Sequence, residues 1–335
     1  MSTNITGFSY HKIGKRYVAE YTDGKWQKGC LTDNAQITLN ECSCVLQYAQ
    51  TCFEGLKAYR TKTGKIVCFR PELNEERLHD SCVRMMIPPL PEGMFKEAVL
   101  EVAEANREWI PDYESNGALY LRPFVFGKNA VIGVKPATEF EFRVFATPVG
   151  SYFDEGEKLL NLRISDYDRA APHGTGNIKA GLNYAMSLFA ITDAHEKGYD
   201  ENVYLDSATR TYIEETGGAN IIFITADNTL VTPKSDSILP SVTRRSLLYV
   251  AKNYLGLKTE ERRVKKDELE SFKECGLCGT AAVISPVGTI DDHGKIYRFD
   301  GVSEEESVIK KLYNTLIAIQ HCNLPAPKGW ITEIA

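Results

Sequence analysis

Residues 174–185, GTGNIKAGLNYA, place a single lysine, Lys179, among small side chains, with Tyr184 five positions later. The run that follows has helical spacing, so Lys179 is expected near a helix N-terminus, where the helix dipole disfavours positive charge. Burial and nearby cations also favour the neutral amine, a nucleophile that can form a Schiff base. The alternative is an ordinary surface lysine. The small neighbours leave room for a flat molecule and favour Schiff-base chemistry.

Aldolases and enzymes that use pyridoxal 5'-phosphate (PLP) both form such Schiff bases, and three other segments favour PLP. PLP needs an acid for its pyridine nitrogen, donors for its phosphate and a hydroxyl near its ring. YIEETGGANIIFI (212–224) supplies two adjacent acids, Glu214 and Glu215. ILPSVTRRSLL (238–248) begins a helix whose N–H groups can bind an anion. CGLCGTAAVISPVG (275–288) contains a turn of small residues with a threonine hydroxyl.

The elements that must position these segments are read from periodicity and from turn residues. Strands are expected at 64–70, 117–127, 140–150, 160–165, 202–206, 219–225 and, after a turn, within 279–290. Helices are expected at 71–87, 91–110, 182–197, 243–256 and 304–321. A polar stretch at 151–161 separates the halves. This order predicts two α/β or α+β domains.

Composition limits the kind of protein. The chain has 335 residues, 43% of them hydrophobic and 25% charged, and at roughly 150 residues per domain it predicts two domains. A net charge of −6 without a basic cluster argues against a nucleic-acid partner. No apolar run has the length of a signal peptide or a membrane span, so we expect a cytoplasmic protein without membrane contact. Nine cysteines, an odd number, are typical of reduced thiols.

Seven segments, in this order, resemble the branched-chain amino acid aminotransferases, which are fold-type-IV PLP enzymes. They are FEGLKAYR, RPELNEERL, LYLRPFVFG, NIKAGLNYA, EETGGANIIF, ILPSVTRRSLL and CGTAAVISPVG, and the resemblance extends from about residue 7 to residue 330. It implies a small N-terminal α/β domain at 1–150, a linker at 151–165, and a larger PLP-binding domain at 166–335 with a mixed, barrel-like sheet. It also implies reversible transamination between L-leucine, L-isoleucine or L-valine and 2-oxoglutarate.

The resemblance assigns cofactor contacts. Lys179 would hold PLP as a Schiff base and move the proton during transamination. Tyr184 would bond the phenolate oxygen of PLP, and Glu215 the pyridine nitrogen; Glu214 is the competing candidate. Arg77 would bind the phosphate, although an ion pair with an acid on its own helix is the alternative. The remaining PLP contacts would come from Leu239, Val242, Thr243 and Thr280.

The resemblance also assigns the substrate pocket. Arg122 would accept the side-chain carboxylate of glutamate, and the amides of Thr280 and Ala281 would bind the α-carboxylate. The apolar and aromatic wall would be formed by Tyr48, Phe53, Tyr120 and Val134. In this family the partner subunit contributes some of these residues, which implies a homodimer. The alternative for the aromatic residues is an ordinary place in the core.

Some positions depart from the family pattern. Animal members carry a redox Cys-x-x-Cys where this chain has Ala282 and Ser285. A different pair, Cys275 and Cys278, lies just upstream; structural thiols rank first, a redox pair second and zinc last, so no metal is expected. Gly218 replaces a threonine of some relatives, which affects one pocket contact.

Two other functions compete with the branched-chain activity. A D-amino acid aminotransferase or an aminodeoxychorismate lyase of the same fold group would share the lysine and the glutamate. The YLRP segment and the Thr-Ala turn favour the branched-chain enzyme. A binding or structural protein on this scaffold, without PLP, would have no reason to retain Lys179, Glu215, Arg77 and Tyr184 together.

Overall fold

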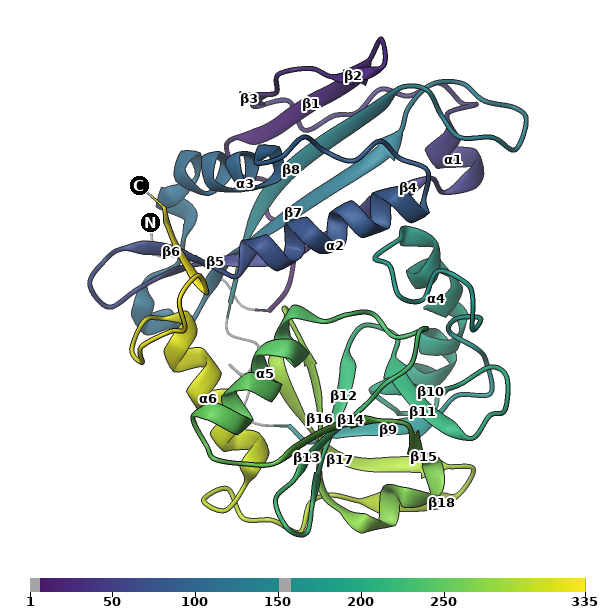
Figure 1. Ribbon diagram of the computed structural model, residues 1–335, viewed down its shortest axis with the longest axis vertical. Coiled ribbons are helices and arrows are strands. Elements are labelled where there is room, and N and C mark those ends of the chain that lie inside the picture. The colour runs from purple at the N-terminus through teal and green to yellow at the C-terminus, as the bar shows by residue number, and fades with distance from the viewer. Residues whose placement is uncertain (1–6, 151–157, 335) are drawn as a thin grey trace. The chain divides into compact units, whose positions relative to one another are not determined.

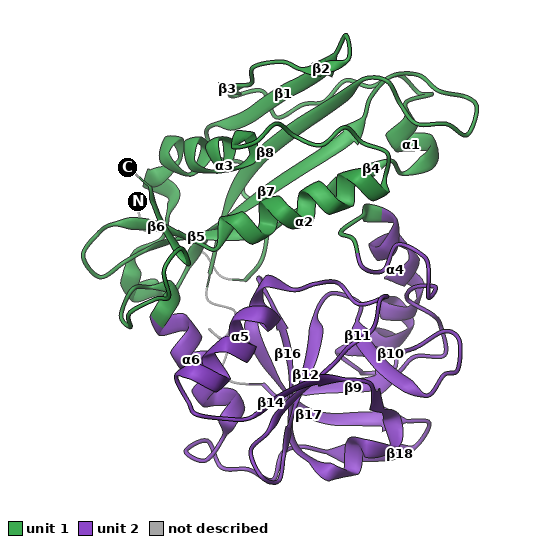
Figure 2. Cartoon of the chain, in the orientation of Figure 1, with its two compact units in different colours: residues 1–154, 178–181, 319–335 green, residues 155–177, 182–318 purple. Residues whose placement is uncertain are grey.

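The computed structural model describes residues 7–150 and 158–334, and the chain forms two compact units (Figure 1). Figure 2 shows the two units: unit 1 contains residues 1–154, 178–181 and 319–335, and unit 2 contains residues 155–177 and 182–318. Part of the expected linker, 151–157, lies outside the described residues. The four residues around Lys179 therefore belong to unit 1, whereas the chain on both sides of them belongs to unit 2.

Unit 1 is built on a nine-stranded sheet with the order β19-β6-β5-β7-β8-β1-β2; β3 pairs with β1, and β4 pairs with β7. Its strands are β1 (Arg16–Thr22), β2 (Lys25–Trp26), β3 (Cys30–Thr32), β4 (Thr51–Phe53), β5 (Leu56–Arg60), β6 (Ile66–Phe69), β7 (Ala118–Gly127), β8 (Phe140–Val149) and β19 (Ile331–Ile334). The long hairpin of β7 and β8 forms the centre, with Arg122 opposite Phe145. Neighbouring strands in this sheet are antiparallel.

Two amphipathic helices, α2 (Pro71–Arg84) and α3 (Met94–Ala105), pack near the unit 1 sheet (Figure 1). Both are shorter than expected, for backbone reasons. Met86 has φ 54°, so α2 ends before the predicted residue 87, and Gly93 has φ 82°, so α3 starts after it. Buried residues of both helices, such as Leu78 and Phe95, form one core with the sheet.

Short helices complete unit 1. They are α1 (Cys44–Tyr48) and the 3₁₀ turns Arg107–Trp109 and Tyr113–Ser115. The first 3₁₀ turn occupies the end of the segment expected to continue α3, because the α-helix stops at Ala105 and a 3₁₀ turn follows.

Unit 2 is built on a ten-stranded sheet with the order β14-β13-β12-β16-β17-β9-β10-β11-β15, and β18 pairs with β17. Its strands are β9 (Leu160–Ile164), β10 (Glu201–Leu205), β11 (Tyr212–Thr216), β12 (Asn220–Thr225), β13 (Leu230–Pro233), β14 (Thr259–Arg262), β15 (Val264–Lys265), β16 (Phe272–Gly279), β17 (Val283–Asp292) and β18 (Lys295–Arg298). Strand β9 runs parallel to β10 and β17, while β12 and β16 are antiparallel. The curled, mixed sheet confirms the expected architecture.

Three helices belong wholly or mostly to unit 2: α4 (Gly181–Glu196), α5 (Val242–Asn253) and α6 (Val308–Gln320), together with a 3₁₀ turn, Lys266–Ser271. Ser241 caps α5, its hydroxyl accepting from Arg244 N. Helix α6 begins at Val308, four residues later than expected, where the buried carboxylate of Glu274 accepts from the first backbone N–H groups. Over the described residues, none of the helices combines the length and apolar character needed to cross a membrane.

Candidate functional site

Lys179 lies beside the sheet of unit 1, held by its own backbone. Its N–H donates to the hydroxyl of Ser81 at 3.1 Å, and its carbonyl accepts from Phe53 N at 3.0 Å. The next residue, Ala180, forms an antiparallel bridge with Cys52. Residues 178–181 thus pair with β4 like a short extra strand. Helix α2, through Ser81, and strand β4, through Phe53, therefore fix the backbone of Lys179 independently of its side chain.

The side chain of Lys179 is in an environment that favours the neutral amine. Loss of hydration, followed by the charge of Arg77, lowers its pKa to about 8, whereas Glu54 acts in the opposite direction. Its Nζ lies 4.9 Å from the centre of the Phe53 ring. The expected neutral nucleophile therefore has a physical cause, which is burial first and a neighbouring guanidinium second.

Helix α2 turns a polar, buried face toward this lysine. Asn74, Arg77 and Ser81 follow helical spacing, and all three are buried. Arg77 forms a two-point ion pair with Glu54, from Nε to Oε1 at 2.7 Å and from Nη2 to Oε2 at 2.8 Å. This ion-pair partner of Arg77 comes from the turn between β4 and β5, outside its own helix.

The expected pocket residues Phe53, Tyr120 and Arg122 lie together on unit 1. Arg122 Nη2 donates to the Tyr120 hydroxyl at 2.9 Å, and its guanidinium lies 4.8 Å from the Phe53 ring centre and 5.2 Å from that of Tyr120. Within the described residues, the buried Nε of Arg122 has no hydrogen-bond partner. A buried donor in this state favours an anionic ligand.

Gly55 explains how the Tyr120 hydroxyl comes so close to the chain before β5. A Cβ at position 55 would lie 2.0 Å from the Tyr120 hydroxyl oxygen. Only glycine leaves room for that oxygen, because a contact so short would force the tyrosine to move. The FEG segment therefore carries a steric requirement as well as the carboxylate of Glu54.

Tyr48 and Val134 lie elsewhere on unit 1. The Tyr48 hydroxyl donates to the carbonyl of Ile132, which joins α1 to the loop that carries Val134. Val134 is 90% exposed and Ile132 is 80% exposed. Two apolar side chains so open to solvent distinguish this loop from the half-buried Phe53 and the buried Tyr120.

In unit 2, the carboxylate of Glu215 is buried and surrounded by donors. Arg169 Nη2 lies 2.7 Å from Oε1, Leu239 N donates to Oε1 at 2.9 Å, and Asn220 Nδ2 donates to Oε2 at 2.5 Å. Burial raises the pKa of Glu215, and Arg169 is the largest influence that lowers it. Arg169 itself also donates to the carbonyls of Ser237 and Gly176. The guanidinium of Arg169 thus pairs with the carboxylate of Glu215, and two backbone carbonyls fix the guanidinium itself.

The competing acid, Glu214, lies on the opposite face of β11, because neighbouring strand residues alternate. It accepts from the hydroxyl of Ser235 at 2.7 Å and lines a cavity of about 390 Å³ with His173 and Lys234 among other residues. Glu215 is absent from that cavity lining. The two adjacent glutamates therefore lie in different environments: Glu214 borders the cavity, and Glu215 contacts Arg169.

The remaining cofactor candidates occupy two turns of unit 2. Val242 and Thr243 form the first turn of α5, where backbone N–H groups are available to an anion. Thr280 and Ala281 lie in the turn between β16 and β17. That turn ends at Val283, a β-branched residue with φ 64°, an arrangement that stores backbone strain. Strained turns of this kind concentrate at ligand sites.

Asn183 secures the segment that carries Lys179 and Tyr184. Thr175 Oγ1 donates to Asn183 Oδ1 at 2.7 Å, and Asn183 Nδ2 donates to the carbonyl of Thr175, also at 2.7 Å. This reciprocal pair joins the chain before Lys179 to the first turn of α4, which includes Tyr184. The two hydrogen bonds therefore hold the two ends of the segment 175–183 together.

The cysteine pair at 275 and 278 lies within strand β16. Both thiols are buried in β16 and unpaired, and burial raises the pKa of Cys278 to about 12. Three positions apart on a strand, they face opposite sides of the sheet. In the described part of the chain, no group of three or more His, Cys, Asp and Glu side chains is arranged to hold a metal.

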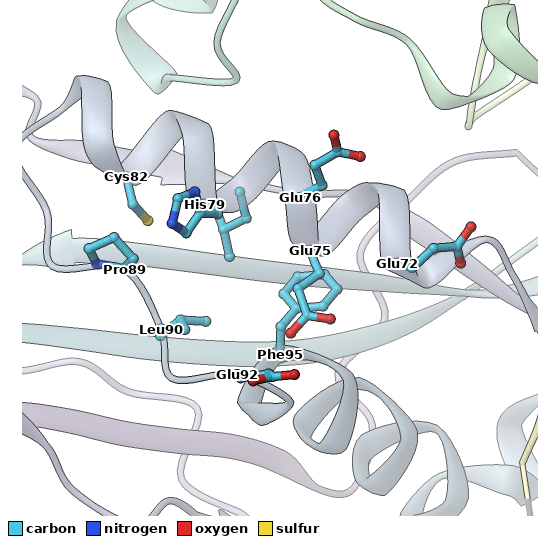
Figure 3. A pocket seen from close by; sticks show the side chains of 10 residues that line it. Glu72, Glu75, Glu76, His79, Cys82, Pro89, Leu90, Glu92 and Phe95 are labelled. Carbon is cyan, nitrogen blue, oxygen red and sulfur yellow. The ribbon is translucent and has the colours of Figure 1, made fainter.

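A separate cavity of about 500 Å³ lies between α2 and α3. Figure 3 shows the side chains that line it. Its lining includes Glu72, Glu75, His79 and Cys82. Their spacing of three and four residues places them on one face of α2, and Arg77 lies on another face. Helix α2 thus divides its side chains: one face meets Glu54 and Lys179, and another borders this acidic cavity. No pattern in the sequence predicts this cavity.

Several site residues were not anticipated. Glu54, Ser81, Arg169, Asn183 and Asn220 hold the expected ones in place. One signal was present: Asn74, Arg77 and Ser81 are polar residues at helical spacing, which on a helix expected to pack against a sheet marks a buried polar face. The partners across the fold gave no local signal.

Comparison with known proteins gives consistent results. The family model described as Amino-transferase class IV matches residues 51–290. The branched-chain-amino-acid aminotransferase of Haemophilus influenzae is 48% identical over 336 residues, which cover 99% of this chain and 98% of that one. That of Helicobacter pylori (strain J99) is also 48% identical and covers 98% of this chain and 96% of its own.

Solved structures agree in fold. The branched-chain amino acid aminotransferase of Escherichia coli superposes with a TM-score of 0.77 at 26% identity and covers 96% of this chain and 99% of its own. That of Thermobaculum terrenum, solved in its PLP form, has a TM-score of 0.79 at 24% identity, with the same coverage of both chains.

Proposed function

The chain belongs to the class IV aminotransferases, as a branched-chain-amino-acid aminotransferase, and from this premise we propose which substrates it uses and which residues do the work. The proposed reaction moves the amino group of L-leucine, L-isoleucine or L-valine reversibly to 2-oxoglutarate. The relatives described above bear the branched-chain name, which does not favour a D-amino acid aminotransferase or an aminodeoxychorismate lyase. The placement of Lys179, whose backbone bonds to Ser81 and to β4 and whose amine lies beside the Phe53 ring, carries the proposal.

The cofactor is PLP, and the described residues fit it. A nucleophilic amine at Lys179, a buried arginine at 77 and a buried carboxylate at Glu215 match the aldehyde, the phosphate and the pyridine nitrogen. When bound, PLP withdraws electrons from the α-carbon of the amino acid attached to it. The residues proposed to hold it are Arg77, Lys179, Tyr184, Glu215, Leu239, Val242, Thr243 and Thr280.

Lys179 is proposed to attach the cofactor and then to carry the proton that leaves the substrate α-carbon. With a pKa of about 8, roughly a tenth of the amine is neutral at pH 7, compared with well under a thousandth at the ordinary value of 10.5. A base with a pKa near the working pH transfers protons efficiently in both directions. The hydrogen bond to Ser81 and the pairing with β4 keep the backbone still while Nζ moves.

Glu215 is proposed to hold a proton on the pyridine nitrogen. A carboxylate can do this only while it is ionised, and burial opposes ionisation. Arg169 opposes that effect with its positive charge, and the N–H of Leu239 and the amide of Asn220 oppose it by donating hydrogen bonds to the charged form. These contacts support Glu215 over Glu214, whose partner is a neutral hydroxyl.

The substrate side chain is proposed to meet Phe53, Tyr120 and Arg122. The rings receive an aliphatic chain, and the guanidinium receives the second carboxylate of glutamate or 2-oxoglutarate. The buried Nε of Arg122, which lacks a partner among the described residues, supports this role. The amides of Thr280 and Ala281 are proposed to bind the α-carboxylate.

We further propose a cytoplasmic homodimer in which Tyr48 and Val134 serve the partner's pocket. All nine cysteines are unpaired, which supports a reducing compartment. Val134 and Ile132 project from one loop almost fully exposed, and burial of apolar side chains of this size favours association. Sedimentation measurements should show a dimer, and Val134→Asp should shift it toward monomer. A monomeric wild type would contradict the proposal.

A substrate panel tests the proposed reaction. Purified protein supplied with PLP should transfer amino groups from L-leucine, L-isoleucine and L-valine to 2-oxoglutarate, and leave D-alanine and aminodeoxychorismate unchanged. Turnover of D-alanine or of aminodeoxychorismate without the branched-chain substrates would replace the proposed activity by one of the two alternatives.

A further inference from the structure

We propose that Glu54 is a positioning residue, which holds the guanidinium of Arg77 in the orientation that receives the phosphate of PLP. The inference rests on the phosphate role proposed above for Arg77. Glu54 lies in the turn between β4 and β5, and its side chain is completely buried. A carboxylate removed from water needs several donors, and each of them is identifiable.

The first two donors belong to Arg77. Nε meets Oε1 at 2.7 Å, and Nη2 meets Oε2 at 2.8 Å. Two parallel charge-assisted bonds fix both the position and the plane of a guanidinium. Glu54 occupies the Nε–Nη2 edge of the guanidinium, so a phosphate cannot bind Arg77 along that edge. Glu54 thereby selects which part of Arg77 faces the ligand.

The other donors prevent Glu54 itself from turning. Oε2 accepts from Asn74 Nδ2 at 2.7 Å and from the N–H of Gly55 at 3.2 Å. Asn74 precedes Arg77 by three residues, and thus lies on the same face of α2. Gly55 binds the carboxylate on the strand side and Asn74 binds it on the helix side. The carboxylate is therefore held rigidly, and we call this fixed carboxylate the mount of Arg77.

The same helix connects this mount to Lys179. Ser81 donates to the carbonyl of Arg77 at 2.8 Å and accepts from Lys179 N at 3.1 Å. The negative charge of Glu54 also offsets the effect of Arg77 on the amine, since Glu54 raises the pKa of Lys179 and Arg77 lowers it. Glu54 thus influences both the orientation of the arginine and the charge felt by the lysine.

A purely structural ion pair would also join α2 to the sheet, so the test must separate anchoring from ligand positioning. PLP and pyridoxal differ only by the phosphate. Loss of positioning should weaken PLP and spare pyridoxal, whereas a general loosening of unit 1 should weaken both. Binding is measured by titrating the apo-protein and following the intrinsic fluorescence.

The central variants are Glu54→Gln, Arg77→Gln and the two combined, with Glu141→Gln as the matched control. Glu141 is another buried carboxylate of unit 1, paired with Arg143, and it has no contact with Arg77 in the described ion pairs. We expect Glu54→Gln to weaken PLP by about 10-fold to 100-fold and pyridoxal by less than about threefold. The double variant should bind PLP no more weakly than Arg77→Gln, and Glu141→Gln should bind it normally.

Three outcomes would overturn the proposal, each in its own way. Equal weakening of PLP and pyridoxal by Glu54→Gln would assign Glu54 to anchoring alone. Unchanged PLP binding in Glu54→Gln, with weakening in Arg77→Gln, would show that Arg77 needs no mount. Unchanged PLP binding in Arg77→Gln would remove the phosphate role of Arg77 while leaving the transamination panel intact.

A milder variant covers the case in which Glu54→Gln does not fold. Asn74→Ala removes one anchor of the carboxylate and leaves the ion pair in place. It should weaken PLP by about threefold to tenfold and leave pyridoxal unchanged. Unchanged PLP binding in a folded Asn74→Ala protein would count against the rigid mount.

Discussion

Each unit contains a buried pair of one glutamate and one arginine, and the two pairs have opposite assignments. In unit 1, Glu54 holds Arg77, and the arginine is the proposed ligand contact. In unit 2, Arg169 holds Glu215, and the glutamate is the proposed ligand contact. A buried ion presented to a ligand needs a counter-ion behind it, since a lone buried charge is costly. The partner behind the contact residue is therefore as much part of the site as the contact itself.

The supporting ions, Glu54 and Arg169, also differ in the groups that hold them. Glu54 receives Asn74 and a backbone N–H, which fix the carboxylate so that it can fix the arginine. Arg169 is instead fixed by two backbone carbonyls, those of Gly176 and Ser237. The variants below test this difference in order of decreasing effect.

The largest effect is expected at Lys179, whose amine is influenced by the charges of both Arg77 and Glu54. Lys179→Ala should lower kcat on the order of 10⁵-fold, because it removes both the attachment point and the proton carrier. Borohydride reduction followed by peptide mass analysis should find PLP on Lys179 in the wild type. Lys57 is a buried lysine of unit 1, and burial lowers its pKa to about 8 as well. Lys57→Met is therefore the matched control and should still carry PLP on Lys179; label on Lys57 would refute the assignment.

The next effect compares neighbouring acids in unit 2. Glu215→Gln should lower kcat by about 10²-fold or more, because a neutral amide cannot hold the proton on the pyridine nitrogen. Glu214→Gln is the control, since both carboxylates are 3% exposed and adjacent in β11. It should change kcat less than about fivefold. Equal losses, or a larger loss at 214, would exchange the roles of the two glutamates.

Removing the supporting ion of unit 2 should change the pH dependence of stability. Arg169 is the main influence opposing the raised pKa of Glu215, so Arg169→Met should raise that pKa further. An acid whose folded pKa exceeds its unfolded value binds protons more tightly when folded. Stability therefore falls as pH rises through the interval between these two pKa values.

Urea unfolding of Arg169→Met between pH 4 and pH 8 should show this decline more steeply than the wild type, reaching a loss of about 3 kcal/mol at the upper end. Adding Glu215→Gln should abolish the extra slope, because the titrating group is gone. A slope in Arg169→Met that survives the second substitution would mean that another acid depends on Arg169.

The smallest effect concerns Arg122, which has no carboxylate partner in the described ion pairs. Arg122→Gln should raise KM for 2-oxoglutarate by about 10-fold to 50-fold, because the carboxylate of that substrate loses a charged donor. The KM for L-leucine should change less than about threefold. Steady-state kinetics with each substrate varied in turn measure this. Equal changes for both substrates would place Arg122 in the framework rather than in recognition.

Periodic elements were predictable from the sequence, and contacts across the fold were not. Helices α2 and α4, and strands β7 and β8, have patterns long enough to identify, and only their ends differ. Short strands such as β4 and β19 have three or four residues, too few for a period to appear. Left-handed residues such as Met86 decide where helices stop, and side-chain identity alone does not reveal them.

The same limit applied to the site. Lys179 and Glu215 were identifiable because their neighbours in sequence are unusual. Glu54 and Arg169 act on residues 23 and 46 positions away, from Glu54 to Arg77 and from Arg169 to Glu215. Such pairing depends on how strands and helices are brought together, which no local pattern encodes. The supporting half of each ion pair therefore became visible only in three dimensions.

Strand β19 affects how the protein is made. It pairs with β6 in the unit 1 sheet, yet all of unit 2 lies between the two strands in the chain. A ribosome thus releases β6 early and its neighbour only after unit 2, and the open strand edge of the nascent sheet invites mispairing. Rapid expression should accordingly favour aggregates that chaperones relieve. A circular permutant that begins with β19 should fold during translation with less assistance.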